Sequence, residues 1–327
     1  SDPTARRCKD IKFAFDRIFT PESSNEEVFD NTTKPILDKF LGGFNCSVFA
    51  YGSTGSGKTH TMLGKTGNLG IMQLTVGELF DRLNALHEDY ICDLNICYFE
   101  VYNETVRDLL KPENGVLSIR ENGLSGVLIN NLSFHEVNLM TTEVAQLLNF
   151  GNQNRTQHPT DANKESSRSH AIYLKQRPKT ANTTTEVVSS KLSLIDLAGS
   201  ERATATKNCG ERFREGANIN KSLLALGNCI NALACGRKGA HIPYRDSKLT
   251  RILKDSLGGS CFTVMIANVR YCSFHYEDTF NTLKYADRAK QIKTDARKNT
   301  FRFDEHVHRY AAIIDELRQE VNNTVSP

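Results

Sequence analysis

The chain has 327 residues, of which 39% are hydrophobic, and a formal net charge of +3. This length and composition allow one large buried core or two small ones and show no sign of disorder, so we expect one large domain. A charge this close to balance excludes a chain coated in basic residues. Affinity for an acidic partner must therefore come from a local patch.

Cysteine usage and hydropathy indicate a soluble protein of a reducing compartment. The nine cysteines form no C-x-x-C pair, and several lie in apolar runs, which favours reduced thiols over a disulfide framework or a zinc site. No apolar run approaches the roughly 18 residues that a membrane span needs, and the first ten residues lack a signal-peptide core. We therefore expect a cytoplasmic protein with no membrane insertion.

In chain order, the apolar periodicity predicts alternating helices and strands. Helices are expected at residues 28–41, 71–87, 217–234 and 278–292, and strands at 47–51, 94–101, 191–196 and 263–269. Gly42 and Gly43 end the first helix, and the polar run 180–186 predicts an exposed turn. Apolar strands between amphipathic helices predict an α/β fold of three layers, in which helices cover both faces of a central, mostly parallel sheet.

The C-terminal region differs from the rest. Residues 293–303 are polar and lack helical periodicity, which predicts a linker. Beyond it, apolar residues recur at alternating spacings of four and three: Phe303, Val307, Tyr310, Ile314, Leu317 and Val321. This short heptad seam predicts a helix over residues 304–327, either the start of a coiled coil or a helix docked on its own domain. The predicted large domain covers residues 1–292.

Residues 52–59, GSTGSGKT, fit the phosphate-loop pattern G-x-x-x-x-G-K-[ST] in full. Glycines let successive backbone N–H groups turn inward as an anion nest, and the helix that follows adds its positive end. Lys58 would reach the β- and γ-phosphates, and the Thr59 hydroxyl would ligate Mg²⁺. The predicted nucleotide-binding residues are Gly52, Ser53, Thr54, Gly55, Ser56, Gly57, Lys58 and Thr59.

Two further stretches bear on the same site. Asp196 ends an apolar strand, where phosphate-loop enzymes place the carboxylate that holds the water shell of magnesium, and Gly199 just beyond could offer its N–H to a γ-phosphate. Residues 163–170, NKESSRSH, gather hydroxyl groups around Arg168 in a polar loop. Alone, the first stretch also fits an ordinary turn and the second a solvated loop. Together with the phosphate loop, Asp196 becomes a strong candidate for the carboxylate that holds magnesium.

Together the three stretches resemble the kinesin motor domain. YGSTGSGKTHTM resembles its phosphate loop, NKESSRSH its first switch and DLAGSE its second. Residues 99–110, 218–227 and 241–253 are also similar to segments of the family and follow in family order. The match runs from about Lys12 to Ile292, and the linker and helix most resemble the class-eight kinesins.

The resemblance implies a P-loop ATPase fold with ATP and Mg²⁺ as cofactors. It implies that Ser166 and Ser167 close around the γ-phosphate and magnesium, that Asn163 helps to order this switch, and that His60 lies near the adenine. Arg168 would pair with Glu201 to lock the two switches. The implied catalytic residues are Lys58, Ser167, Arg168, Asp196, Gly199 and Glu201, and the implied magnesium-binding residues are Thr59, Ser167 and Asp196.

Two basic segments could bind an acidic partner. Residues 237–254 hold six Lys or Arg and one Asp, a net +5 in a chain whose total is +3. Helical spacing places Leu249, Ile252, Leu253 and Leu257 on one face, and Lys248, Arg251 and Lys254 on the opposite face. The second segment, residues 202–221, follows the second switch. A solvated face is the ordinary alternative reading of such charges.

The resemblance assigns both basic segments to the acidic surface of the microtubule, formed by tubulin. The implied contacts are Lys207, Arg212, Arg214, Lys221, Arg237, Lys238, Arg245, Lys248, Arg251 and Lys254. Nucleic acid is the rival acidic polymer, but Phe213 and Tyr244 are the sole aromatic residues in these windows, which argues against base stacking.

The resemblance makes residues 293–303 the neck linker and residues 304–327 the neck helix. The implied function is a microtubule-stimulated ATPase that moves along microtubules, toward the plus end because this neck follows the motor core. The alternatives are an ATP-dependent depolymerase or end regulator, which could combine both activities, and a catalytically poor microtubule-binding adaptor. The resemblance also implies a homodimer in the full-length protein and a location on cytoskeletal microtubules, with spindle and cilium as candidates.

Two departures from the family pattern stand out. The first strand of the family carries Arg-x-Arg-Pro and contributes to the adenine pocket, yet nothing like it precedes Lys12. We expect that this strand lies outside the sequence in hand, which leaves His60 as the one base contact that the chain can name. The stretch from Ala171 to Lys175 is shorter than the strand that leaves the first switch of the family, so its pairing stays open.

Overall fold

The structure is a computed structural model that describes residues 11–65, 67–86, 90–122, 126–137, 141–154, 167–178, 184–200, 211–236, 240–258 and 260–304. Within these residues, the main sheet has nine strands in the order β12-β1-β11-β10-β4-β5-β6, with β13 beside β11 and β9 beside β4. The strands are β1 (Asn45–Tyr51), β4 (Tyr90–Tyr102), β5 (Thr105–Asp108), β6 (Val116–Leu117), β9 (His135–Glu136), β10 (Ser167–Pro178), β11 (Thr184–Asp196), β12 (Cys261–Ala267) and β13 (Thr300–Asp304). Two separate hairpins pair β2 (Gly64–Lys65) with β3 (Asn68–Leu69), and β7 (Ile119–Asn122) with β8 (Gly126–Ile129).

The sheet is mixed, which corrects the expectation of a mostly parallel sheet. β1 is parallel to β11 and to β12, but β10 is antiparallel to both β11 and β4. Short connections account for the β10–β11 and β4–β5 pairs, because two strands joined by a few residues can pair only in the antiparallel sense. β4 turns into β5 through Asn103 and Glu104, both with positive φ, as a tight hairpin turn requires.

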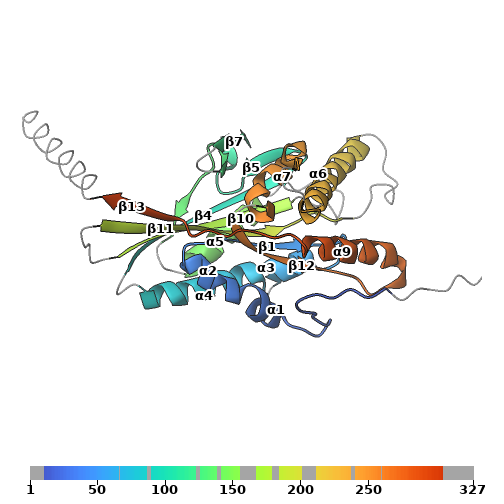
Figure 1. The fold of residues 1–327 in the computed structure, drawn as a ribbon, viewed down its shortest axis with the longest axis horizontal. Coiled ribbons are helices and arrows are strands. Elements are labelled where there is room, and N and C mark those ends of the chain that lie inside the picture. Colours follow the sequence, from blue (N-terminus) through green and yellow to red (C-terminus); the bar gives the residue numbers. More distant parts are fainter. Residues whose placement is uncertain are drawn as a thin grey trace, which may run out of the picture.

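Helices cover both faces of the sheet, so the three-layer expectation is confirmed (Figure 1). One layer holds α1 (Asn25–Thr32), α2 (Lys34–Leu41), α3 (Lys58–Leu63), α4 (Ile71–Leu86) and α5 (Thr141–Gln153). The other holds α6 (Glu211–Ala234), α7 (Lys248–Ile252), α8 (Lys254–Gly258) and α9 (Tyr276–Ala289).

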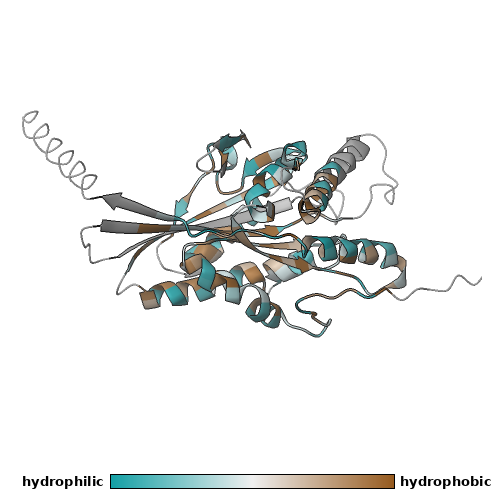
Figure 2. Cartoon of the chain, in the orientation of Figure 1, coloured by the Kyte–Doolittle hydropathy of each residue, from teal (hydrophilic) through white to brown (hydrophobic). Residues whose placement is uncertain are grey.

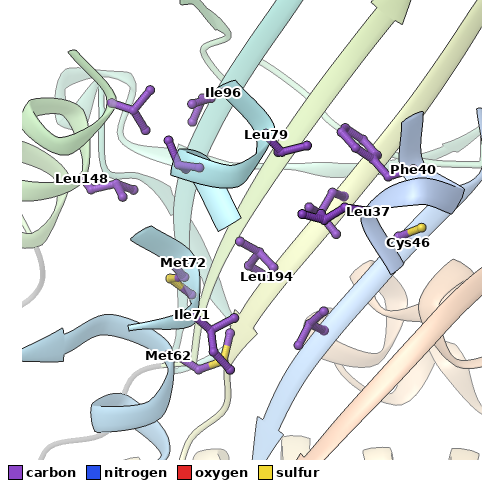
Figure 3. Close-up of a cluster of buried hydrophobic side chains, with 14 of the residues drawn as sticks. Leu37, Phe40, Cys46, Met62, Ile71, Met72, Leu79, Ile96, Leu148 and Leu194 are labelled. Carbon is purple, nitrogen blue, oxygen red and sulfur yellow. The ribbon is translucent and has the colours of Figure 1, made fainter. Parts of the chain in front are cut away.

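Alternation along the central strands explains the two layers. Side chains of successive strand residues point to opposite faces. Val48 and Leu194 accordingly join the core beneath α1–α5, whereas Phe49 and Ile195 join the core beneath α6–α9. Figure 3 shows the first of these cores, in which side chains from α2, α3, α4 and α5 meet those of the sheet. Both cores are needed because the central strands are buried on both sides.

Two expected helices are divided. The helix expected over residues 28–41 forms as α1 and α2, separated at Thr33, because Pro35 in the first turn of α2 cannot donate a backbone hydrogen bond. The basic helix expected around residues 248–257 forms as α7 and α8, with a break at Leu253, whose ψ is 1°. Leu249, Leu253 and Leu257 are nevertheless all buried, as the spacing predicted.

The amphipathic pattern of the other helices is borne out by their burial. α9 carries mostly hydrophilic residues (Figure 2) and buries Thr282, Tyr285 and Ala286.

The strand after the first switch is long rather than short, since β10 spans 12 residues and pairs with both β4 and β11. The turn expected at residues 180–186 falls largely outside the described residues; β11 begins at Thr184.

The segment after α9 contains a strand that the sequence did not predict. β13 lies antiparallel to β11, with Val188 opposite Thr300 and Thr184 opposite Asp304 (Figure 1). Just before it, the backbone N–H of Asn299 donates to Gly43 O at 2.9 Å. Phe303, the first residue of the heptad seam, belongs to β13. The rest of that seam lies outside the described residues, and the helix and coiled coil stay predictions.

Candidate functional site

The phosphate loop follows β1 and leads directly into α3. Gly52, Gly55 and Gly57 all have positive φ, and Gly57 caps the amino end of α3. At Gly52 a Cβ would overlap the carbonyl oxygen of Asn268, so this position accepts only glycine. Ser53, Thr54 and Ser56 complete the loop between the glycines. The loop has the buried strand before it and the helix after it that a phosphate site requires.

Lys58 is the buried cation of this loop. Its side chain is 5% exposed, and Nζ donates to Gly52 O and to Ser53 O, both at 2.9 Å. These carbonyl groups are neutral, so the charge of the ammonium group is solvated but not balanced by them. A buried cation of this kind fits an anionic ligand such as a phosphate, because an unpaired charge is costly to bury.

Thr59 and Asp196 form the candidate magnesium site. Parallel pairing places Ala50 opposite Asp196, so the ends of β1 and β11 lie side by side, and Thr59 Oγ1 donates to Asp196 Oδ2 at 2.7 Å. Hydroxyl and carboxylate oxygens are ligands that Mg²⁺ prefers, and it usually keeps water and phosphate oxygens as its other ligands. The described residues contain no cluster of three or more His, Cys, Asp or Glu that could hold a metal without such help.

The switch residues are described only in part. Ser167 and Arg168 begin β10, and strand register places Arg168 opposite Asp196 on one side and Glu100 on the other. Gly199 is buried beyond the end of β11, and the next residue, Ser200, donates its N–H to Gly52 O at 3.0 Å. The second switch therefore contacts the phosphate loop directly. Asn163, Ser166 and Glu201 lie outside the described residues, so the Arg168–Glu201 pair stays a prediction.

His60 lies in the first turn of α3 and is partly exposed. Its carbonyl oxygen accepts a hydrogen bond from Asn25 Nδ2 at 3.1 Å, which ties the start of α1 to α3. The same Asn25 amide donates to Leu69 O at 3.0 Å. The structure thus fixes the backbone at His60, and the expected contact of its ring with adenine stays a prediction.

Two residues after β12 brace the phosphate loop and α3, and they were missed in the sequence. The amide of Asn268 donates to Thr61 Oγ1 at 3.0 Å, and Arg270 Nε donates to Gly55 O at 3.1 Å. Arg270 Nη1 also lies 2.7 Å from His275 Nε2. No motif marks these residues, because they reach the loop through the parallel pairing of β12 with β1. They add one positive charge beside the phosphate site.

Two basic segments were predicted to bind an acidic partner. Residues 237–254 include α7 and the first residue of α8, and residues 202–221 include the first half of α6. Arg245 is exposed, Lys248, Arg251 and Lys254 are partly exposed, and Lys221 is exposed on α6. Arg212 and Arg214 fall within α6, in a part where only the backbone is described. Lys207, Arg237 and Lys238 lie outside the described residues. The buried side of α7 and α8 is as expected, but Arg245, Arg251 and Lys254 meet an acidic residue, Glu121, rather than solvent alone.

The phosphate loop lies between a buried strand and a helix, and its threonine is hydrogen-bonded to an aspartate at the end of the neighbouring strand. This arrangement defines a P-loop NTPase. The family model described as "Kinesin motor domain" matches residues 1–292. The chain therefore belongs to the kinesin motor domain family.

Curated relatives and solved structures agree with this family. The chain is 54% identical over 319 residues to Kinesin-like protein KIF18B of Gallus gallus, with 96% of this chain and 40% of that protein covered. It is 53% identical over 324 residues to Kinesin-like protein KIF18A of Mus musculus, covering 98% of this chain and 36% of that protein. The chain thus spans about two fifths of the length of these relatives.

Two solved kinesin structures have the same fold. The structure described as that of a fast kinesin superposes with a TM-score of 0.80 and 37% identity, covering 88% of this chain and 82% of the other. The second is the KIF14 dimer with AMP-PNP in complex with a microtubule, with a TM-score of 0.77, 36% identity, and coverage of 85% and 80%. These matches confirm the P-loop fold. Among the described residues, no helix is long and apolar enough to cross a membrane.

Proposed function

We propose that this chain is an ATP-driven microtubule motor that hydrolyses ATP with Mg²⁺ and moves toward the plus end. The observation that carries the proposal is that the neighbouring strands β1 and β11 contact both the nucleotide site and the neck segment. At one end, Asp196 and the phosphate loop form the nucleotide site. At the other, Asn45 of β1 and Ser189 of β11 hold Asn299 of the neck segment, through Asn45 Oδ1 at 3.0 Å and the Ser189 N–H at 3.0 Å.

The groups of this chain suit phosphoryl transfer to water. ATP and Mg²⁺, when bound, supply the phosphoryl group and a Lewis acid. Lys58 and the backbone N–H groups of the phosphate loop would neutralise phosphate charge, while Thr59 and Asp196 would hold the metal. Ser167, Arg168 and Gly199 lie at strand ends beside Asp196, where closure of the switches would exclude bulk water and position the attacking water. The predicted site also includes the switch residues Glu201, Ser166 and Asn163. His60 would lie near the adenine base.

The basic segments supply the partner surface. Acidic tubulin would meet the exposed cations around α6, α7 and α8, and this face lies on the same side of the sheet as the core beneath α6–α9. The segment after the second switch begins where Ser200 contacts the phosphate loop. Binding of nucleotide and of the track can therefore bias one another through a shared element. The heptad seam supports a homodimer in the full-length protein, located on cytoplasmic microtubules.

A gliding assay with polarity-marked microtubules, with filament length recorded over time, tests this function. We expect directed gliding with the plus end trailing, and an ATPase rate that rises with microtubule concentration. Shortening filaments without gliding would favour the depolymerase alternative, and both together would indicate a combined activity. Binding without stimulated hydrolysis would favour the passive adaptor and refute the motor.

A further inference from the structure

The β7–β8 hairpin is fixed against α7. Ile252 of α7 packs with Ile119 and Ile129 of the hairpin on a buried cluster of Cys97, Phe99, Val101, Val106, Leu117 and Leu132. Arg251 Nη2 also donates to Ile119 O at 3.3 Å. These contacts combine apolar packing with a hydrogen bond to the backbone, so the side chains of β7 have a defined position relative to the basic segment.

Glu121 of β7 meets three cations of that segment. Its carboxylate lies 3.5 Å from Arg245 Nη2, 3.5 Å from Arg251 Nε and 3.8 Å from Lys254 Nζ. The Glu121 side chain is 22% exposed, whereas that of Arg245 is 81% exposed. One negative charge thus faces three positive charges, and the cluster keeps a net charge of +2.

Glu121 is ionised at neutral pH. Its partial burial acts to raise the pKa of the carboxyl group, but the charges of Lys254, Arg245 and Arg251 hold that pKa below its ordinary value. The carboxylate is therefore always available to these cations under physiological conditions. Any acidic partner that docks here must share the same three side chains.

We propose that Glu121 is an internal counter-ion of the track-binding face, which competes with the carboxylates of an acidic track for Arg245, Arg251 and Lys254. This inference rests on the proposed function, because it takes the partner to be the acidic surface of a microtubule. The internal ion pairs weaken binding and its dependence on salt. They also hold Arg245, Arg251 and Lys254 close together when no partner is bound.

The size of the effect follows from the exposure of the pairs. Ion pairs at this degree of exposure contribute about 0.2–1 kcal/mol each, and they are screened by salt. Loss of the Glu121 charge should therefore tighten microtubule binding roughly two- to five-fold at low ionic strength. Glu121→Asp keeps the charge and should bind like the unmodified chain.

Co-sedimentation with microtubules in ADP over a series of KCl concentrations tests the competition. We expect Glu121→Gln to bind more tightly at low salt, with a steeper salt dependence, and the difference to disappear at high salt. Adding Lys254→Gln to this variant returns the cluster to +2 and should bring the salt dependence back toward that of the unmodified chain. Glu113→Gln, which removes the same charge from an exposed position in another turn, is the matched control.

The possible outcomes separate the two proposals. Equal or weaker binding by Glu121→Gln, or equal effects of the Gln and Asp variants, would overturn the counter-ion while the proposed function stands. Absence of microtubule binding by the unmodified chain would overturn both. Thermal unfolding midpoints of the variants show whether each is folded, and the Asp variant separates loss of charge from loss of packing.

Discussion

The contact between Asn299 and Asn45 allows a quantitative test of how the neck segment docks. Asn299 Nδ2 donates to Asn45 Oδ1 at 3.0 Å, and that oxygen also accepts the backbone N–H of Lys191 at 3.0 Å. The Asn299 backbone makes two further hydrogen bonds, with Gly43 O and the Ser189 N–H. Asn299→Ala removes only the side-chain bond, because Asn45 Oδ1 keeps its second donor.

A net hydrogen bond of this kind contributes about 1 kcal/mol, so Asn299→Ala should lower the ratio of docked to undocked neck about five-fold. Exchange of the Ser189 amide measures this ratio, since its N–H is bonded to Asn299 O when the neck is docked. We expect exchange at Ser189 to become about five-fold faster. Microtubule gliding should slow, while nucleotide binding stays near that of the unmodified chain.

Asn114→Ala provides the matched control, because it removes an exposed amide hydrogen bond, from Asn114 Nδ2 to Asn131 O, that involves none of the described neck residues, 293–304. An Asn45→Ala variant and the double variant complete a cycle that isolates the pair from the Lys191 contact. Unchanged Ser189 exchange and unchanged gliding velocity in Asn299→Ala would refute the idea that this side chain holds the neck in place.

Three further predictions concern the nucleotide site and the helix layer beneath it. Glu201→Ala should bind ATP but lose nearly all microtubule-stimulated turnover, and near-normal turnover would refute the switch pair. Arg270→Ala loses the donor to Gly55 O and should raise the KM for ATP about five-fold with little change in kcat, with partial rescue by Lys; an unchanged KM would exclude the brace. Arg82→Ala should cost about 0.5–1 kcal/mol of unfolding free energy at neutral pH, because its hydrogen bond lowers the pKa of Glu78. That contribution is complete above the ordinary pKa of 4.5 and is lost as the pH falls through the lowered folded value, so equal destabilisation at pH 7 and pH 3 would contradict it.

Local patterns in the sequence predicted the parts of the site that are contiguous in the chain. The phosphate-loop pattern requires two glycines, a lysine and a serine or threonine at fixed spacing, so the sequence alone indicates both the conformation of the loop and its ligand. Asp196 could be assigned to the nucleotide site because it ends an apolar strand, and in a parallel sheet the carboxyl end of one strand lies beside that of its neighbour. The break at Thr33 could also have been foreseen, since Pro35 is visible in the sequence and interrupts helical hydrogen bonding.

Contacts between distant segments were not predictable in this way. β13 does alternate polar residues with Phe301 and Phe303, but five residues are a weak signal in an otherwise polar segment. It pairs with residues 184–188 of β11, a part of that strand that β1 does not pair with. Arg270 and Glu121 carry no motif, and each acquires its partners only when two segments more than a hundred residues apart pack together. The strand with Arg-x-Arg-Pro stays a prediction.

Tyr51 connects the nucleotide site to α9, the helix before the neck. Its ring stacks on that of Tyr285 in α9, with centroids 4.1 Å apart and planes 5° apart. Burial raises the pKa of Tyr51 to about 12, and a hydrogen bond with Ser200 partly offsets this rise, so the phenol stays protonated beside the second switch. The ring beside Ser200 is thus packed tightly against α9. Arg288 of the same helix also donates from Nη1 to Asn231 Oδ1 of α6 at 2.6 Å, so a continuous set of contacts runs from Ser200 through Tyr51 and α9 to α6. Contacts of this kind are a physical route by which the nucleotide site and the start of the neck could be coupled.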